Sequence, residues 1–289
     1  MILTSDIQKC AMFIAYKASD GSYVHMGTAF LVTLPFPEIN GSFSYVVTAR
    51  HVIAKIYQQV VDKVFISANT YEGFNWIETN IDKWIPHPDY RVDVSVIALS
   101  FAASVYDIRS LSPTMAVNDE IISKQKIGPG DEIFLTGLFE SHIGKHKNLP
   151  IVRTGNIALM PEELVEVTID KKTQQMEAYL IEARSIGGLS GSPVFVYRAY
   201  HPGSEKAFYW LGLMHGHWNV KSNEKQESEE ISQDAAYIPP HERINMGIAI
   251  VVPATKVLEA MNQPYFADAR ERVIAHYKQF GNLDILRDS

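Results

Sequence analysis

The sequence of 289 residues contains a single cysteine, Cys10. One cysteine excludes an intramolecular disulfide and a metal site built from several cysteines. The chain also lacks an apolar run of about 18 residues, the length that a membrane-spanning helix requires. Its first residues lack a positively charged segment followed by a long apolar run, so no signal peptide is predicted. Together these absences predict a cytoplasmic protein that folds without disulfides.

An excess of positive charge is also absent. Lysine and arginine number 26 against 33 aspartates and glutamates, which gives a formal net charge of −7. No basic stripe interrupts this balance, so nucleic acid is not expected as a partner. Hydrophobic residues make up 46% of the chain, which at this length is enough to bury a large core. The composition therefore predicts a soluble globular protein.

The ten histidines show no spacing that is typical of a metal site. No HExxH motif occurs, and the pair in "HIGKH" at 142–146 encloses Gly144, which disfavours a helix there. No metal ion and no other cofactor is predicted.

Short apolar, β-branched or aromatic runs separated by turn residues dominate the chain, which is the pattern of β-strands. The first half has six such runs, at 10–17, 26–34, 44–49, 64–69, 74–79 and 94–101. The second half has seven, at 132–139, 151–159, 164–169, 176–183, 192–197, 208–216 and 246–252. We therefore predict an all-β fold class with two tandem six-stranded β-barrels and a C-terminal helical segment.

Three segments are predicted along the chain. They are an N-terminal β-barrel at 1–115, a C-terminal β-barrel at 116–252 and helices at 253–289 that pack on the barrels. The helical segment begins near Pro253 and later places Val273 and Tyr277 on one helix face. A polar and acidic stretch at 218–245 is predicted to be a long surface loop.

The stretch "GGLSGSPVFV" at 187–196 surrounds Ser190 with glycines. A nucleophilic serine needs small neighbours because a substrate must approach closely. It also needs backbone N–H groups that stabilise a developing oxyanion, and Gly188 and Ser190 supply two such donors. The same residues are common in a turn before a strand. Ser190 is therefore a candidate only if a base and a carboxylate accompany it.

A candidate base, His51, lies in "YVVTARHVIA" at 45–54. The residues before it form a predicted strand that ends in small side chains, and the residues after it begin a predicted helix. An imidazole at such a junction is held on rigid backbone and can point into a cleft. A single histidine is nevertheless more often structural than catalytic.

A candidate carboxylate, Asp93, lies in "HPDYRVDVSVIALS" at 87–100, directly before an apolar strand that should be buried. A buried carboxylate is costly unless it is paired. Holding one imidazole N–H is such a pairing, and it leaves the other nitrogen free for the serine. Asp89 competes for this role but lies in the preceding turn. The chain order His51, Asp93, Ser190 is that of chymotrypsin and not that of subtilisin or the α/β-hydrolases.

These motifs resemble trypsin-like serine peptidases of the chymotrypsin fold, and bacterial HtrA-type protease domains more than digestive enzymes. "TARHV" resembles the family's histidine box, "DVSVIAL" its aspartate strand and "GLSGSP" its serine box, and the likeness covers roughly residues 20–255. The resemblance implies that Ser190 attacks a peptide carbonyl, that His51 takes and returns the proton, and that Asp93 orients His51. It also implies an oxyanion hole formed by the backbone N–H groups of Gly188 and Ser190.

Some positions depart from the family pattern. Leu189 stands where trypsin has an aspartate, so activation by an ion pair with a new N-terminal amine is not expected. Ser95 stands where alanine is usual. Nothing that resembles a PDZ domain follows the protease-like part, so peptide sensing through such a domain is not expected either.

The resemblance also points to a substrate pocket. In this family the residue six positions before the nucleophile lies near the pocket floor, and here it is Arg184. A cation at that place predicts a preference for acidic or uncharged side chains at the cleavage position. The strand at 211–218 resembles the pocket wall, which directs His215 or His217 toward the substrate.

We predict a serine endopeptidase that cleaves proteins or peptides through an acyl-enzyme intermediate. The alternative is a protease-fold binding or scaffold module with little or no turnover, because a deformed oxyanion hole is invisible in a sequence. The means of restraint stays open between a regulatory protein partner, an inactive conformation around 185–190, the loop at 218–245 and strict substrate recognition. No membrane partner is expected.

Overall fold

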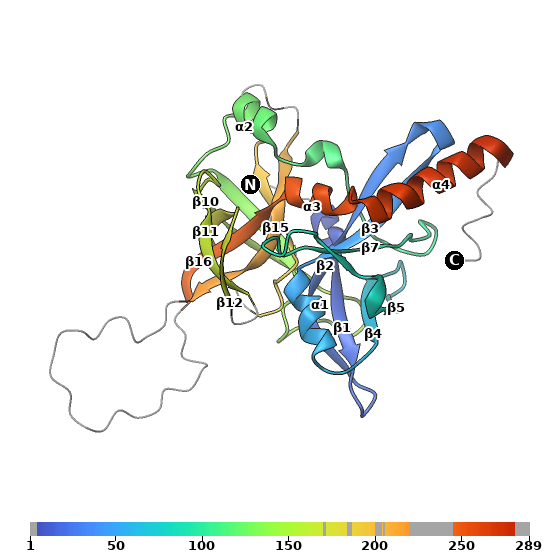
Figure 1. Ribbon diagram of the computed structural model, residues 1–289. Helices are drawn as coiled ribbons and strands as arrows, with labels where there is room; N and C mark the ends of the chain where they lie inside the picture. The colour runs from blue at the N-terminus through green and yellow to red at the C-terminus, as the bar shows by residue number, and fades with distance from the viewer. Residues whose placement is uncertain are drawn as a thin grey trace, which may run out of the picture.

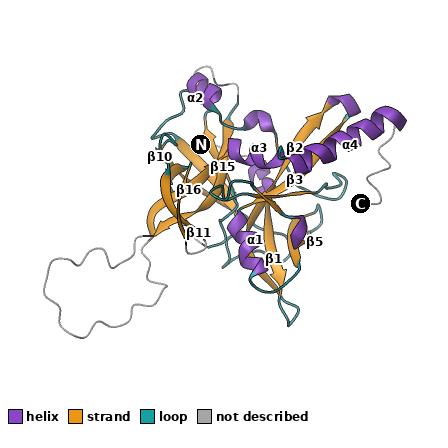
Figure 2. Cartoon of the chain, in the orientation of Figure 1, coloured by secondary structure: helices purple, strands orange, loops and turns teal. Residues whose placement is uncertain are grey.

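The computed structural model describes residues 5–169, 172–183, 187–199, 204, 206–219 and 245–280. Two groups of β-strands lie side by side, with helices on the outside (Figures 1 and 2). The α-helices are α1 (Arg50–Tyr57), α2 (Asp119–Gln125), α3 (Ala254–Met261) and α4 (Pro264–Phe280). None of the helices in the described ranges combines the length and the apolar composition that crossing a bilayer requires.

The first half forms an eight-stranded sheet in the order β5-β4-β1-β2-β3-β7-β6, with β8 paired to β2. Its strands are β1 (Ala11–Lys17), β2 (Tyr23–Phe36), β3 (Gly41–Thr48), β4 (Lys63–Asn69), β5 (Phe74–Asn80), β6 (Ile85–Pro86), β7 (Ser95–Ala98) and β8 (Ser110–Leu111). The six runs predicted from the sequence fall on β1 to β5 and β7. Within the described residues the outer strands β5 and β6 do not pair with each other, so this sheet stays open where a closed barrel is predicted.

The second half contains a closed barrel of six strands in the order β10-β13-β16-β15-β14-β9. Its strands are β9 (Glu132–Gly137), β10 (Ile151–Leu159), β13 (Tyr179–Glu182), β14 (Pro193–Tyr197), β15 (Phe208–Asn219) and β16 (Asn245–Pro253). A separate hairpin joins β11 (Val165–Ile169) to β12 (Lys172–Met176). The all-β class with C-terminal helices is confirmed, and the arrangement is consistent with a chymotrypsin-like fold of two β units.

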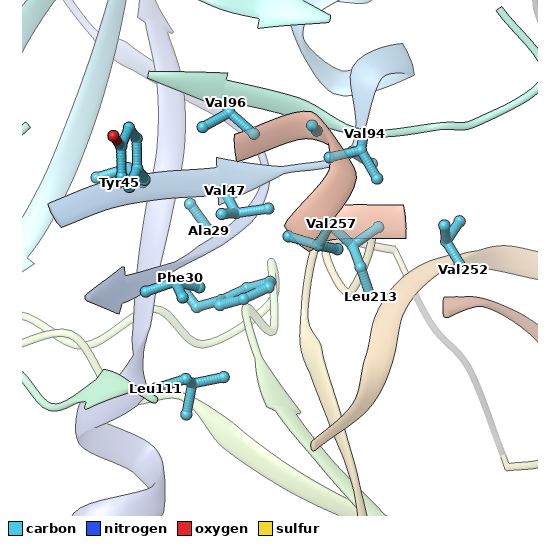
Figure 3. Close-up of a cluster of buried hydrophobic side chains, with 14 of the residues drawn as sticks. Ala29, Phe30, Tyr45, Val47, Val94, Val96, Leu111, Leu213, Val252 and Val257 are labelled. Carbon is cyan, nitrogen blue, oxygen red and sulfur yellow. The ribbon is translucent and has the colours of Figure 1, made fainter. Parts of the chain in front are cut away.

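One hydrophobic core crosses both halves. Side chains from β2, β3, β7, β15, β16 and α3 gather in it (Figure 3), among them Phe30, Val47, Val96, Leu213, Val252 and Val257. Across the boundary, Phe30 meets Trp210 edge to face with ring centroids 5.5 Å apart. Because the halves share this core, side chains that project from one half have defined positions relative to the other.

Helix α4 is hydrogen-bonded to the first half through Arg270, a contact that we call the C-terminal clasp. Buried Arg270 of α4 donates to the hydroxyl of Tyr45 on β3 at 2.7 Å and to the carbonyl of Met261 at 2.7 Å. Figure 1 shows α4 running beside the β2–β3 end of the sheet. The predicted helices are thus present as far as residue 280, whereas most of the predicted loop, residues 220–244, lies outside the described residues.

Candidate active site

His51 is held at the start of a helix whose cap comes from another part of the chain. Strand β3 ends at Thr48, and Ala49, at the N-cap of α1, has no side-chain oxygen for the first helical N–H groups. Asp93 supplies one instead, because the backbone N–H of His51 donates to its Oδ1 at 2.8 Å. This bond satisfies a helical donor that would otherwise lack a partner. It also fixes Asp93 beside the imidazole of His51.

The second oxygen of Asp93 contacts the imidazole itself. The Nδ1 of His51 lies 2.7 Å from Oδ2 of Asp93. Asp93 is fully buried directly before β7, between the buried side chains of Val92 and Val94. The structure therefore brings His51 and Asp93 together through two contacts, one to the backbone and one to the ring. The backbone contact fixes the position of the carboxylate, and the ring contact fixes the orientation of the imidazole.

Asp89 serves a different purpose. Its carboxylate accepts a hydrogen bond from Nη2 of Arg91 at 2.8 Å and another from the Arg91 backbone N–H at 2.9 Å. These hydrogen bonds lower the pKa of the Asp89 carboxyl to about 2. The residue closes the turn before Asp93, which excludes it as the partner of His51.

The Ser190 loop is bound to the opposite half of the molecule. The backbone N–H of Thr28 on β2 donates to the carbonyl of Ser190 at 2.8 Å, and the Thr28 hydroxyl donates to the carbonyl of Gly188 at 2.8 Å. Gly188 and Gly191 have φ values of +91° and +87°, a conformation that side chains with a Cβ rarely adopt. The glycines noted in the sequence thus permit this loop shape.

Glycines also let the serine loop approach α1. A Cβ on Gly191 would lie 2.0 Å from the carbonyl of Thr28 and 3.2 Å from the backbone nitrogen of Ala49. A Cβ on Gly27 would lie 2.9 Å from the carbonyl of Ser190 and 2.9 Å from a methyl group of Val52. The loop and the start of α1 therefore meet across Gly27, which brings Ser190 next to the helix that carries His51.

The hydroxyl of Ser190 donates to the backbone carbonyl of His215 at 3.1 Å. In the described residues it makes no hydrogen bond to His51, so the expected serine–histidine contact is not formed in this conformation. The backbone N–H groups of Gly188 and Ser190 donate to no acceptor within the described part of the chain. Their role as oxyanion donors stays a prediction.

His215 occupies a place that the sequence does not indicate. Its Nδ1 lies 2.5 Å from Oδ2 of Asp93, the same oxygen that His51 contacts. The contact with Asp93 is a second place for this ring beside the predicted substrate pocket, and the pocket role of His215 stays a prediction. The contact joins residues 122 positions apart, and no local motif could have revealed it. Arg184, the other pocket residue predicted, lies outside the described residues.

The charge of Asp93 depends on both histidines. Burial alone would raise the pKa of the Asp93 carboxyl, but the charges and hydrogen bonds of His51 and His215 hold that pKa well below its usual value. The N-terminal end of α1 favours the negative charge as well. Asp93 is thus a buried carboxylate that stays ionised.

The same three side chains present potential metal ligands. One ligand atom from each side chain lies within 4.8 Å of the other two, and this is the only such cluster among the described residues. Two ligands of one tetrahedral zinc ion lie about 3.3 Å apart, given metal–ligand bonds of about 2.0–2.1 Å. The contacts of 2.5 and 2.7 Å from Asp93 to the rings are shorter and match hydrogen bonds. We therefore assign the cluster to a hydrogen-bond network.

Comparison with known proteins gives a limited result. No protein-family model and no curated protein matches the sequence. Among solved structures, the chain is similar to AL20, a thermostable serine protease from an extremophilic microorganism, with a TM-score of 0.45 and 9% identity. The match covers 88% of this chain and 96% of that one. Assignment of a function therefore rests on the geometry around Ser190, His51 and Asp93.

Proposed function

We propose that the chain is a serine endopeptidase. Ser190 is the nucleophile, His51 the general base and acid, and Asp93 the residue that orients His51. The backbone N–H groups of Gly188 and Ser190 form the oxyanion hole. The reaction runs through an acyl-enzyme that water then hydrolyses.

The double contact between Asp93 and His51 carries this proposal. A carboxylate on Nδ1 keeps the proton on that nitrogen, so Nε2 is left as the base. A buried and ionised carboxylate also stabilises the imidazolium that forms when His51 takes the serine proton. A histidine with only a structural role at a helix start would not need a buried carboxylate beside it, because burying that charge costs free energy.

Ser190 must turn before it can react. Its hydroxyl leaves the His215 carbonyl and rotates about one side-chain bond toward Nε2 of His51, a change between staggered rotamers. One neutral hydrogen bond is exchanged for another, so the change costs about 1 kcal/mol or less. Substrate in the cleft favours the reactive rotamer, because catalytic hydrogen bonds often tighten only in the Michaelis complex.

The substrate class rests on the resemblance of the three sequence boxes to those of peptidases. Proteins or peptides are the proposed substrates, with acidic or uncharged side chains at the cleavage position on account of Arg184. Cleavage of a peptide library after acidic residues supports this preference, and cleavage mainly after lysine or arginine contradicts it.

The test of the function is proteolysis by matched serine variants. Wild type and Ser192→Ala should cleave a fluorogenic peptide library, because the buried Ser192 hydroxyl has no hydrogen-bond partner among the described residues. Only the backbone of Ser192 is hydrogen-bonded there. Ser190→Ala should lose at least about 10³-fold in kcat. Equal activity in wild type and Ser190→Ala would rule the proposal out.

A second candidate function is supported by one observation. The Ser190 hydroxyl is bonded to the His215 carbonyl and not to His51, as expected of a protease-fold binding module without turnover. If the chain is such a module, the wild type and the Ser190→Ala variant should bind peptides with equal affinity. Neither should release a cleaved product. Peptide binding measured by calorimetry, together with the absence of cleavage, would favour this alternative.

A further inference from the structure

His215 is the extra residue of a β-bulge. On β15, Met214 pairs with Val251 and Gly216 pairs with Ile250, so His215 has no partner residue on β16. A bulge bends the strand and changes the direction of a side chain, and bulges are frequent next to active sites. Strand β15 thus departs from regular pairing at the one residue whose ring reaches Asp93.

His215 binds two of the three proposed catalytic residues. Its ring nitrogen contacts Oδ2 of Asp93 at 2.5 Å, while its backbone carbonyl accepts the Ser190 hydroxyl at 3.1 Å. The side chain is buried, with 8% of the residue exposed. Any residue at this position could supply the carbonyl, but a histidine that only fills space would not need the ring contact with Asp93.

One carboxylate oxygen therefore serves two imidazoles. The rings of His51 and His215 lie 5.3 Å apart at 77°, and each directs Nδ1 at Oδ2 of Asp93. One negative charge can neutralise one imidazolium but not two. A proton on either ring must then oppose a proton on the other, because both imidazoliums would share one carboxylate.

We propose that His215 is a positioning residue that acts on His51 through the shared Asp93 oxygen. While His215 is neutral, the charge of Asp93 is free to stabilise the His51 imidazolium that forms as Ser190 attacks. Once His215 is protonated, the charge of Asp93 stabilises the His215 imidazolium instead, and His51 becomes a weaker base. This inference rests on the proposed function, since the proton in question comes from Ser190.

Few other charged groups reach this cluster. Among the described residues packed against β15, strands β14 and β16 and the segment Pro113–Met115 carry none. Helix α3 carries Lys256 and Glu259, which pair with each other near the surface. On α1, Arg50 donates to the Tyr90 carbonyl at an exposed position, and Lys55 lies at the far end of the helix. On β15 itself, His217 is half-buried two positions further along.

Two substitutions separate the hydrogen bond from the titration. His215→Asn keeps a side-chain N–H close to the position of Nδ1 but cannot take up a proton. His215→Leu removes both the donor and the titratable group and keeps an apolar side chain in the buried site. His276→Asn, on α4, is the matched control for the loss of a half-buried histidine.

The pH profile of kcat/KM should report the coupling. Full activity needs both rings neutral, and the first proton disfavours the second. A plot of log kcat/KM against pH should therefore bend in the wild type, with a slope of one below the first macroscopic pKa and a slope of two below the second. In His215→Asn the limb should have a slope of one, with a plateau within about threefold of wild type. His215→Leu should lose about tenfold or more in kcat with little change in KM, because Asp93 loses a hydrogen bond to a charged group.

Histidine NMR provides a readout that needs no turnover. In the wild type, His51 should titrate in two steps, and in His215→Asn in one step, while His276→Asn should match the wild type. If the wild type and His215→Asn agree in both NMR titration and acid-limb slope, the inference is overturned and the peptidase proposal stands. If the coupling is present but neither the wild type nor any variant cleaves peptide, the peptidase proposal fails. The coupling of His215 to His51 through Asp93 then stands without a catalytic role.

Discussion

Asp93 is the residue on which the site depends most. It accepts hydrogen bonds from the His51 backbone, the His51 ring and the His215 ring. These three donors offset the cost of burying a charge that no water can reach. The same donors hold the pKa of the Asp93 carboxyl well below its usual value, so that the group is ionised at the pH at which the proposed mechanism uses His51 as a base.

Asp93 also predicts how stability changes in acid. Its folded-state pKa lies well below the ordinary value of 3.8, so the ionised group adds stability above about pH 4 that is lost as the pH falls through its folded-state pKa. Urea unfolding should show a smaller loss of stability from pH 5 to pH 3 in Asp93→Asn than in wild type. Asp82→Asn, which removes an exposed carboxylate without an ion pair in the described residues, should follow the wild type. An unchanged pH dependence in Asp93→Asn would contradict the assignment.

The same substitution should impair catalysis. An asparagine can hold His51 in the wrong tautomer, which in a serine protease triad lowers kcat by about 10⁴. Steady-state kinetics at the pH of the activity plateau measure this, with Asp89→Asn as the neighbouring control. A loss of less than about tenfold in Asp93→Asn would remove Asp93 from the mechanism.

Cys10 offers a second test at the residue scale. Burial of the thiol raises its pKa to about 12, from a usual value of 9.0. The folded protein should therefore react slowly with a thiol reagent at pH 8 and completely in denaturant. Because the folded pKa is raised, the related stability is present below pH 9 and is lost as the pH rises toward 12. Rapid labelling of the native protein would show that the thiol is accessible.

At the scale of elements, the Ser190 loop is held by the hydroxyl of Thr28. This buried group donates to the Gly188 carbonyl and accepts the Leu138 backbone N–H, both at 2.8 Å. It therefore links β2 of the first half with the serine loop and with the end of β9. The link fixes the peptide that joins Gly188 to Leu189, which lies between the two proposed oxyanion donors, the N–H groups of Gly188 and Ser190.

Thr28→Val should therefore weaken the oxyanion hole. The substitution leaves two buried backbone groups without partners, which costs about 1–3 kcal/mol of stability. A shift of this loop would displace one of the two proposed oxyanion donors, a loss of about 10²-fold or more in kcat. Thr33→Val, on the same strand, removes a half-buried hydroxyl bonded only to Ser44 and should retain activity. Full activity in a folded Thr28→Val variant would contradict the role of this link.

The sequence predicts most strands because they are short apolar, β-branched or aromatic runs separated by turn residues. Strands β6 and β8 are not predicted from the sequence, because each has only two residues. Helix α2 is not predicted, although Asn118 caps it by accepting the Ile121 backbone N–H, a signal that the residues do carry. The rotamer of Ser190 and the direction of the His215 ring depend on long-range contacts, which no spacing in the sequence encodes.

At the scale of the whole molecule, we expect the shared core and the C-terminal clasp to contribute to the free energy of unfolding. The main hydrophobic cluster contains residues of both sheets and of α3. The predicted division at residues 115 and 116 stays a prediction, and the shared core argues for one cooperative unfolding transition. Circular dichroism and tryptophan fluorescence should report the same midpoint, and separate midpoints would show that the halves unfold independently.

Arg270 tests the clasp itself. Its guanidinium bonds the Tyr45 hydroxyl, the Met261 carbonyl and Oδ1 of Asn262. Arg270→Met should lower the free energy of unfolding by about 2–4 kcal/mol, because buried partners lose bonds to a charged donor. The control Arg272→Met removes an exposed arginine two residues away and should stay within about 0.5 kcal/mol of wild type. Equal stability of the two variants in urea would show that the clasp contributes little.

The most direct test of the central claim is covalent labelling of the nucleophile. Folded wild type should react with a fluorophosphonate to give one adduct, visible by intact mass spectrometry and located on Ser190 by peptide mapping. Ser190→Ala should give none, and Asp93→Asn should label far more slowly. Folded wild type that stays unlabelled, or an adduct that persists in Ser190→Ala, would contradict the account.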